Sequence, residues 1–233
     1  MRILAIGAHP DDIEVLCGGT MAKYAARGDQ VTFMIATNGN VGSPTLSKGE
    51  IAAVRYKEAE ASAALIGADL IWLDYDDEFL FHDRETRMAF INGIRKANPD
   101  VMFVLGPTDY HPDHRICSEI SIDCRIPVTV PLIVTEHPHM DKVPHVFITD
   151  TVGGIDFQPE AYVDITDTFD MKARMLRCHK SQDDWLQYMY GTDIVNHAER
   201  ISSMRGLGPG VKYAEGFRSL PLFPITGGPQ LLP

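Results

Sequence analysis

Two short polar stretches, far apart in the sequence, carry the side chains best suited to bind a metal ion. The first is Ala8-His9-Pro10-Asp11-Asp12, and the second is Tyr110-His111-Pro112-Asp113-His114. Imidazole and carboxylate groups are ligands that zinc accepts. Adjacent carboxylates repel each other, so a divalent cation is the natural group to neutralise them. Each stretch also has a simpler interpretation. In the first, Pro10 makes a turn and an Asp caps the following helix; in the second, Asp113 is a helix cap and the two histidines lie on the surface.

Together the two stretches supply the parts for metal-assisted hydrolysis of an amide or ester. Two imidazoles and one carboxylate that leave one coordination position open form a catalytic zinc arrangement. A second carboxylate, free of the metal, can deprotonate the bound water, and a further imidazole can stabilise an oxyanion. The residues available for these roles are His9, Asp11, Asp12, His111, Asp113 and His114.

The surrounding pattern predicts elements that bring the two stretches together. Strands are predicted at 3–6, 30–37, 70–73 and 101–105, and the helices between them end near Gly28, Gly67 and Asn98-Pro99. This order implies an α/β fold, a Rossmann-like three-layer sandwich with a mainly parallel central sheet. In such sheets the first and fourth strands are often neighbours, and ligands bind beyond their carboxyl ends. Both polar stretches lie at such ends.

The pattern changes after residue 122. Strands are predicted at 127–134 and 145–149, a short last strand at 161–165, a helix from Asp167, order at 213–220 and a surface tail from Pro221. Residues 184–190 contain three aromatic side chains, for which an interior helix or a subunit contact is preferred to a sugar-binding platform. Arg55 and Glu58 have the spacing of a solvated ion pair on a helix, and the acids of 74–78 are typical of a solvated loop.

Composition narrows the class of protein. The 233 residues are expected to form a single domain, 1–233, with a full core. A net charge of −11 argues against nucleic acid and anionic membranes as partners. No apolar run is long enough to span a membrane, and no signal-peptide pattern is present. Cys17, Cys117, Cys124 and Cys178 lack CxxC spacing, so we expect reduced, mostly buried cysteines in a cytoplasmic protein.

Beyond these patterns, the sequence resembles the LmbE-like or PIG-L deacetylases. This family includes N-acetylglucosaminyl-phosphatidylinositol de-N-acetylase and the deacetylases of mycothiol and bacillithiol synthesis. The resemblance rests on motifs that occur in order along nearly the whole chain: AHPDD at 8–12, TNG at 37–39, RxxE at 55–58, HPDH at 111–114, HxSQ at 179–182 and YAEGFR at 213–218.

The resemblance implies a zinc-dependent hydrolase that removes the acetyl group from an N-acetylglucosamine-type sugar or glycoside. The implied Zn²⁺ ligands are His9, Asp12 and His114. Asp11 would be the general base that acts on the zinc-bound water. His111, oriented by Asp113, would stabilise the oxyanion.

The resemblance also implies three substrate-binding positions. Arg55 would contact the substrate, Asp77 would take the place of a sugar-binding Asp, and His179 would lie at the pocket wall. The family commonly has Asp-Gly where this chain has Asp77-Glu78. This departure leaves the role of Asp77 and the conformation of its loop open.

Other functions stay open at the level of the sequence. They are an amidase on a sugar–thiol conjugate in the same family, a non-catalytic metal- or sugar-binding relative, and a Rossmann-type nucleotide-binding enzyme. Intact Asp11 argues against simple binding, and the missing GxGxxG argues against the nucleotide binder. The expected partner is a small N-acetylated sugar of unspecified identity. A homo-oligomer is also open, with residues 185–190 as a contact.

Overall fold

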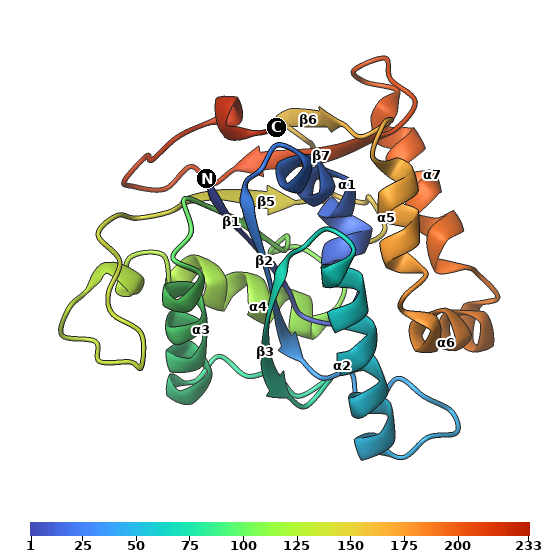
Figure 1. Cartoon of the computed structure of the whole chain (residues 1–233), viewed down its shortest axis with the longest axis horizontal. Helices are drawn as coiled ribbons and strands as arrows, with labels where there is room; N and C mark the ends of the chain where they lie inside the picture. The colour runs from blue at the N-terminus through green and yellow to red at the C-terminus, as the bar shows by residue number, and fades with distance from the viewer.

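A seven-stranded sheet lies between two layers of helices (Figure 1). The computed structural model describes residues 1–233. Its strands are β1 (Arg2–Gly7), β2 (Gln30–Thr37), β3 (Asp69–Tyr75), β4 (Val101–Val104), β5 (His145–Thr149), β6 (Ala161–Asp164) and β7 (Ala214–Ser219). Its helices are α1 (Asp12–Ala26), α2 (Lys48–Ala64), α3 (Arg84–Ala97), α4 (Pro112–Asp123), α5 (Phe169–Leu176), α6 (Lys180–Tyr190) and α7 (Ile194–Gly206). The predicted Rossmann-like α/β fold is confirmed.

The order of the strands explains why the two polar stretches meet. The sheet runs β3-β2-β1-β4-β5-β7-β6, and β1 pairs in parallel with both β2 and β4. The predicted neighbourhood of the first and fourth strands is thereby confirmed. Since β1 and β4 are parallel, their carboxyl ends lie at the same edge of the sheet, at the bottom of Figure 1. From β1 the chain first adds β2 and β3 on one side and then returns to add β4 on the other. The crevice at such a change of direction is where α/β sheets bind ligands.

Alternation along the strands assigns the two faces of the sheet. In β1, Ile3 and Ala5 join one buried cluster, whereas Leu4 and Ile6 join the other. Helices α1, α2 and α5 cover the first face, and α3 and α4 cover the second. A strand with apolar residues on both sides belongs in the middle of a sheet that is covered on both faces. The continuous apolar run of β1 therefore fixes its central position.

Local signals in the sequence set several helix ends. Ser47 and Glu50 form the predicted capping box at the start of α2. The Asp83 side chain accepts a hydrogen bond from the Thr86 N–H and caps α3 as predicted. Pro112 occupies the first turn of α4, where its missing N–H costs nothing.

The strand predicted at 127–134 is wrong. The structure has a 3₁₀ turn at Pro127–Thr129 followed by a loop. Proline supplies no N–H for a ladder, and the carbonyl groups of the segment are bound elsewhere. The buried guanidinium of Arg95 donates hydrogen bonds to the carbonyls of residues 127, 128, 130 and 133. A single cation from α3 thus replaces the partners that a sheet would have provided.

Two further predictions need correction. β6 is not the last strand, because β7 follows it in sequence and inserts between β5 and β6, antiparallel to both. The interior-helix interpretation of 184–190 is wrong, since no residue of α6 is buried.

The four cysteines are unpaired, and three of them are buried. No helix combines the length and apolar character needed to cross a membrane.

Candidate active site

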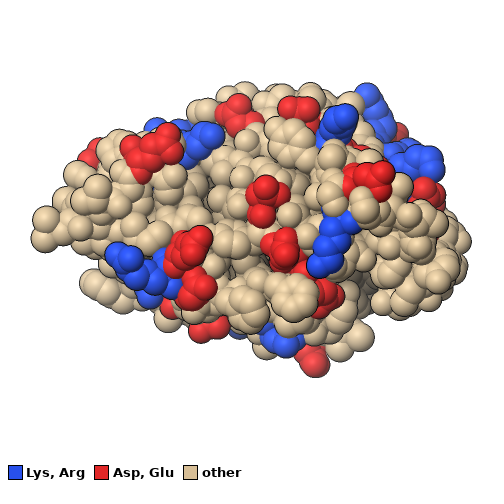
Figure 2. Space-filling model, turned by 90° about the horizontal axis from the view of Figure 1, so that it is seen from below, with Lys and Arg blue, Asp and Glu red and all other residues tan.

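A cavity of about 630 Å³ opens at the carboxyl ends of β1 and β4. Its lining includes both polar stretches, the loop after β3 and one side of α6. Figure 2 looks onto this end of the molecule, where acidic side chains lie in the middle of the face and most Lys and Arg lie toward its margins. The size falls within the range of small-molecule sites.

Three donor groups converge on one point inside this cavity. His9 Nδ1 lies 3.1 Å from His114 Nε2. The Asp12 carboxylate approaches both rings, with Oδ1 3.2 Å from His114 Nε2 and Oδ2 3.6 Å from His9 Nδ1. Two ligands of a tetrahedral zinc ion with bonds near 2.1 Å are about 3.4 Å apart. The three groups therefore fit a single ion with no rearrangement of the fold.

The opposite nitrogen of each of these two imidazoles faces a carboxylate. His114 Nδ1 is hydrogen-bonded to Asp109 Oδ1 at 2.9 Å, whereas His9 Nε2 lies 2.9 Å from Asp77 Oδ1 without hydrogen-bond geometry. A carboxylate hydrogen-bonded to the second nitrogen fixes the tautomer and orientation of a metal-binding histidine, as Asp109 does for His114. All four side chains are buried, so the arrangement is held on both sides of the point of convergence.

His111 lies near the same point, but both of its nitrogens are engaged. One nitrogen from each of the three histidines lies within 4.8 Å of the others. In His111, Nδ1 accepts a hydrogen bond from the Asp113 N–H at 3.2 Å, and Nε2 lies 3.1 Å from Glu78 Oε1. A neutral ring with an accepting Nδ1 carries its proton on Nε2, so neither lone pair is free. This geometry favours His9, Asp12 and His114 as the ligand set.

Asp113 contacts His111 through its backbone, whereas its carboxylate holds the loop after β3. Oδ2 accepts a hydrogen bond from the Glu78 N–H at 2.8 Å, and Oδ1 accepts one from the Leu80 N–H at 3.3 Å. The interpretation of Asp113 as a simple helix cap with two surface histidines is wrong, because Asp113 and His114 are both buried.

Asp11 is a free carboxylate beside the point of convergence. It precedes α1 with φ 108°, a conformation rare outside glycine, and its side chain does not cap the helix. The cap interpretation is therefore wrong for Asp11. Burial and the neighbouring charge of Asp12 raise the pKa of Asp11 to about 7, against the opposing effects of Arg55 and His179. Backbone strain of this kind concentrates at functional sites.

Arg55 reaches the cavity from α2 and is buried, so the predicted solvated pair with Glu58 is wrong. Its Nε and Nη2 atoms have no hydrogen-bond partner. The space for the guanidinium is provided by Gly39, which has φ +65° and where a Cβ would overlap Arg55. The glycine of the TNG motif is thus needed twice, for its backbone conformation and for the arginine.

The loop after β3 is held from two sides. Asn40 Nδ2 donates to Asp76 Oδ1 at 2.7 Å, and Asn38 Nδ2 donates to Asp74 Oδ1 at 3.1 Å. Asp113 holds its far end, as described above. The solvated-loop interpretation is wrong for Asp77, which is buried against His9, although Asp74 and Asp76 are exposed.

The RxxE and HxSQ motifs meet at the start of α6. Glu58 accepts hydrogen bonds from the Ser181 N–H at 2.9 Å and from Ser181 Oγ at 2.5 Å. His179 is buried and is absent from the cavity lining, with Nε2 3.0 Å from Glu14 Oε1. Ser62 donates to the same Glu14 oxygen. These contacts lock α2, α1 and α6 together behind Asp11.

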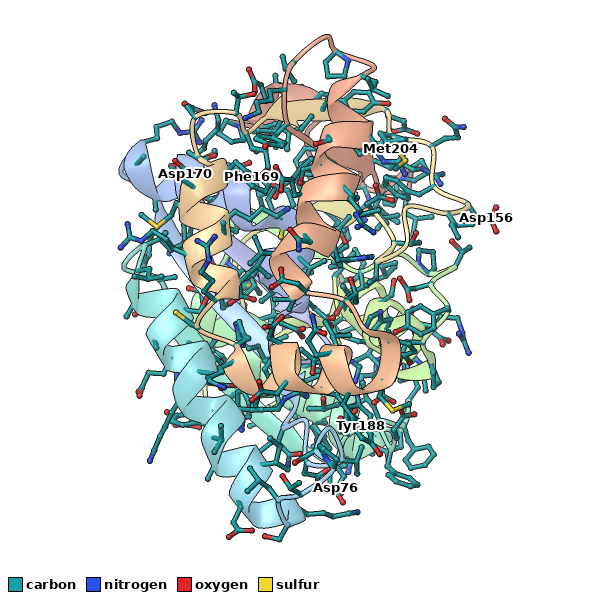
Figure 3. All side chains as sticks on the ribbon, turned by 90° about the vertical axis from the view of Figure 1, so that its right-hand side faces the viewer. Asp76, Asp156, Phe169, Asp170, Tyr188 and Met204 are labelled. Carbon is teal, nitrogen blue, oxygen red and sulfur yellow. The ribbon has the colours of Figure 1, made fainter.

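Helix α6 closes one side of the cavity. Figure 3 shows this helix crossing below α5 and α7, with Tyr188 just below it. Gln182, Trp185 and Tyr190 line the cavity, and Tyr110 lines it from the opposite motif. Aromatic rings therefore stand at the mouth of a site whose floor is made of carboxylates and imidazoles.

Three contributors were missed in the sequence: Glu14, Glu78 and Asp109. Asp109 lies two residues before His111, in the loop between β4 and α4, so its position offered a signal. Glu14 lies three residues after Asp11, in the first turn of α1, where an acid is ordinary. Glu78 was noted only as a departure from a family pattern, and nothing local reveals its contact with His111.

Similarity to known proteins identifies the family of the chain. A family model described as "PIG-L: GlcNAc-PI de-N-acetylase" matches residues 4–124. The diacetylchitobiose deacetylase of Thermococcus kodakarensis is 30% identical, over 94% of this chain and 83% of that protein. The solved N,N'-diacetylchitobiose deacetylase from Pyrococcus horikoshii, complexed with its inhibitor MPG, has a TM-score of 0.82 and 31% identity, covering 94% of this chain and 83% of that one.

A second solved structure shows that the fold is also used for other chemistry. The 4-carboxy-2-hydroxymuconate hydratase from Pseudomonas putida has a TM-score of 0.81 at 20% identity, over 94% of this chain and 96% of its own. At this identity the likeness extends to the fold alone. The family match and the 30% identical deacetylase carry the assignment, and they confirm the resemblance inferred from the motifs. The chain belongs to the PIG-L family of de-N-acetylases, enzymes that hydrolyse amide bonds.

Proposed function

We propose that this enzyme removes the acetyl group from a neutral N-acetylglucosamine-type sugar with the help of one Zn²⁺ ion held by His9, Asp12 and His114. The observation that carries the proposal is the convergence of these three groups at 3.1–3.6 Å. Asp77 and Asp109 stand behind the two imidazoles. When bound, the ion would polarise the acetamide carbonyl and lower the pKa of a water molecule.

Asp11 is the general base of the proposed reaction. It lines the cavity beside Asp12, and its side chain is free of any cap contact. It takes a proton from the attacking water and returns it to the amine as the C–N bond breaks, which releases acetate. His111 Nε2–H is the donor for the oxygen of the carbonyl as negative charge develops on it.

Arg55 is proposed to orient the sugar. Buried N–H groups without a partner are costly, and Arg55, whose Nε and Nη2 have no partner, is one of the residues that line the cavity. A carbonyl or hydroxyl oxygen of the substrate would satisfy them. Asp77 lines the same cavity while it contacts His9, so it supports the metal site and forms part of the sugar pocket. His179 is proposed to act from behind, through Glu14 and Asp11.

The charges of the cavity favour an uncharged aglycone. Asp11, Asp12, Asp77 and Glu78 line it, and Arg55 is its only Lys or Arg. A phosphate or malate attached to the sugar would meet this excess of carboxylates, whereas the rings of Trp185 and Tyr190 suit the C–H face of a second sugar. Diacetylchitobiose, the substrate in the names of the 30% identical relatives, has this character.

The test is acetate release from a panel of N-acetylated substrates. Diacetylchitobiose and N-acetylglucosamine should be hydrolysed faster than N-acetylglucosaminyl malate, and a sugar–thiol conjugate in the panel tests the amidase alternative. A strong chelator should abolish the activity, and added Zn²⁺ should restore it. Activity that survived exhaustive metal removal would contradict the mechanism. If the enzyme hydrated 4-carboxy-2-hydroxymuconate and released no acetate from any sugar, the proposed deacetylase activity would be wrong and the protein would be a hydratase.

A further inference from the structure

We infer that Glu78 is a positioning residue for His111. Its carboxylate holds the imidazole in the tautomer and orientation in which Nε2–H faces the cavity. The inference rests on the proposed function, because it assigns His111 the role of donor to the substrate carbonyl. It concerns a residue at which this chain departs from the Asp-Gly pattern of its family.

The ring of His111 is held at both nitrogens. The Asp113 N–H donates to Nδ1 at 3.2 Å, and Glu78 Oε1 lies 3.1 Å from Nε2. The first contact makes Nδ1 an acceptor, so the proton of the neutral ring is on Nε2. The second contact supplies an acceptor for that proton. Together they leave one tautomer and one ring orientation.

The backbone of Glu78 is shaped by the same cluster. Glu78 has φ 68°, in the left-handed region that glycine adopts without strain. Its N–H donates to Asp113 Oδ2 at 2.8 Å, which holds the residue in this conformation. A glycine would make that backbone contact equally well. The contact with His111 is the interaction that only a side chain at position 78 can make.

The position of the carboxylate allows the substrate to replace it. The Glu78 side chain is 49% exposed and lines the cavity. When an acetamide oxygen approaches Nε2–H, the carboxylate can turn to water with little loss of solvation. Glu78 therefore holds the donor ready in the free enzyme without blocking it in the complex.

Two substitutions separate positioning from charge. Glu78→Gln keeps an oxygen acceptor for Nε2–H and removes the negative charge, whereas Glu78→Gly removes the acceptor and keeps the backbone conformation. Asp156→Gly is the matched control. Asp156 is an exposed acid with φ 57° that projects at the right-hand margin of Figure 3 and is not part of the cavity lining.

We expect Glu78→Gly to lower kcat about tenfold, the size of effect seen when an orienting partner of a functional histidine is lost. KM should change much less, since the donor acts mainly in the transition state. Glu78→Gln should retain most of kcat, and Asp156→Gly should match the wild-type protein. The ¹⁵N NMR spectrum of His111 in the zinc-supplemented protein should show a single Nε2–H tautomer in the wild type and in Glu78→Gln. Glu78→Gly should show a mixture, because without the Oε1 acceptor the ring can turn away from the Asp113 N–H and populate the second tautomer.

A Glu78→Gly variant with wild-type kcat and an unchanged His111 spectrum would overturn the inference. The inference would also fail if Glu78→Gln lowered kcat as much as Glu78→Gly does, because the loss of negative charge would then explain the fall in kcat. If the wild-type protein released no acetate from any sugar, the proposed function would fail. The NMR comparison would still decide whether Glu78 positions His111.

Discussion

Two buried carboxylate clusters lie along helix α1, one at its start and one near its middle, and they differ in character. At its start, Asp11 and Asp12 face the cavity, and their neighbour Arg55 keeps two nitrogens without partners. Near its middle, Glu215 from β7 meets Lys172 from α5, with Oε1 2.7 Å from Nζ. The first cluster thus keeps unpaired polar atoms, whereas both carboxylate oxygens of Glu215 accept hydrogen bonds.

The Glu215 carboxylate binds backbone N–H groups of α1 next to a kink in the helix. The helix is interrupted at Cys17, where φ is −146°. Beyond the kink, the N–H groups of Gly19 and Thr20 donate to the Glu215 carboxylate at 3.0 and 2.8 Å. The Thr20 hydroxyl donates to it as well. These contacts give the glutamate of the YAEGFR motif a structural role in α1.

The difference teaches how to separate function from support in this fold. A buried cluster whose donors and acceptors are all paired has nothing left to offer a ligand. A cluster that lines a cavity and retains unpaired groups can form its remaining hydrogen bonds with a ligand. Substitutions in the first cluster should therefore change activity and leave folding intact, and those in the second should do the reverse.

The largest expected effect on activity is that of Asp12→Asn. The substitution removes a carboxylate that we propose as a zinc ligand, so we expect bound zinc to be lost and kcat/KM to fall by at least about 10³-fold. Thermal unfolding of the metal-free protein should change little by comparison, because the chain has a core independent of the metal. Metal analysis and acetate release measure the two quantities. Zinc retained at one per chain would remove Asp12 from the ligand set.

Asp11→Asn should be almost as damaging but by a different route. Zinc should stay bound at about one per chain, while kcat falls by roughly 10²–10⁴, the usual contribution of a general base. KM should change much less. The comparison with Asp12→Asn decides between the neighbouring carboxylates. If Asp11→Asn lost its zinc and Asp12→Asn kept it, the two roles would have to be exchanged.

Glu215→Gln tests the supporting cluster. The change leaves the Lys172 ammonium buried without its counter-charge, which costs about 3–5 kcal/mol in the free energy of unfolding. The specific activity of the remaining folded protein should stay close to that of the wild type. Denaturant unfolding and active-site zinc content measure the two effects. Adding Lys172→Met should recover part of the stability, since it removes the unpaired charge.

A control for this prediction is the exposed pair of Lys180 and Asp184 on α6. Asp184→Asn should leave the unfolding midpoint unchanged, because surface pairs contribute little. A loss as large as that of Glu215→Gln would show that burial is not what makes the Glu215 pair important.

The same contrast explains how much could be predicted from the sequence. The strand ends that carry His9 and His111 are readable because strand, turn and motif are contiguous, and parallel order then brings them together. Arg95, Glu215 and the Glu58–Ser181 contact depend on partners distant in sequence. One sequence does not reveal such partners. Where they decide the structure, as at 127–134, local propensity gave a strand that does not exist.

The smallest effect is expected at the aromatic side of the cavity. Trp185 lines it from α6 and stacks on Tyr188 with ring centroids 5.9 Å apart. Its proposed contribution is contact with the second sugar, so Trp185→Ala should raise KM for diacetylchitobiose about three- to tenfold, equivalent to the roughly 0.5–1.5 kcal/mol of an aromatic contact. The kcat should hold, because the proposed contact of the ring is with the second sugar and not with the acetamide.

The effect on KM should be smaller for the monosaccharide N-acetylglucosamine, which has no second ring to place against Trp185. Tyr162→Ala, on the edge strand β6 and outside the cavity lining, is the control and should alter neither constant. Equal losses on the two sugars would place Trp185 against the reacting sugar. A fall in kcat instead of a rise in KM would mean that α6 positions the metal site. Helix α6 would then belong, with Asp11 and Asp12, to the part of the structure that decides activity.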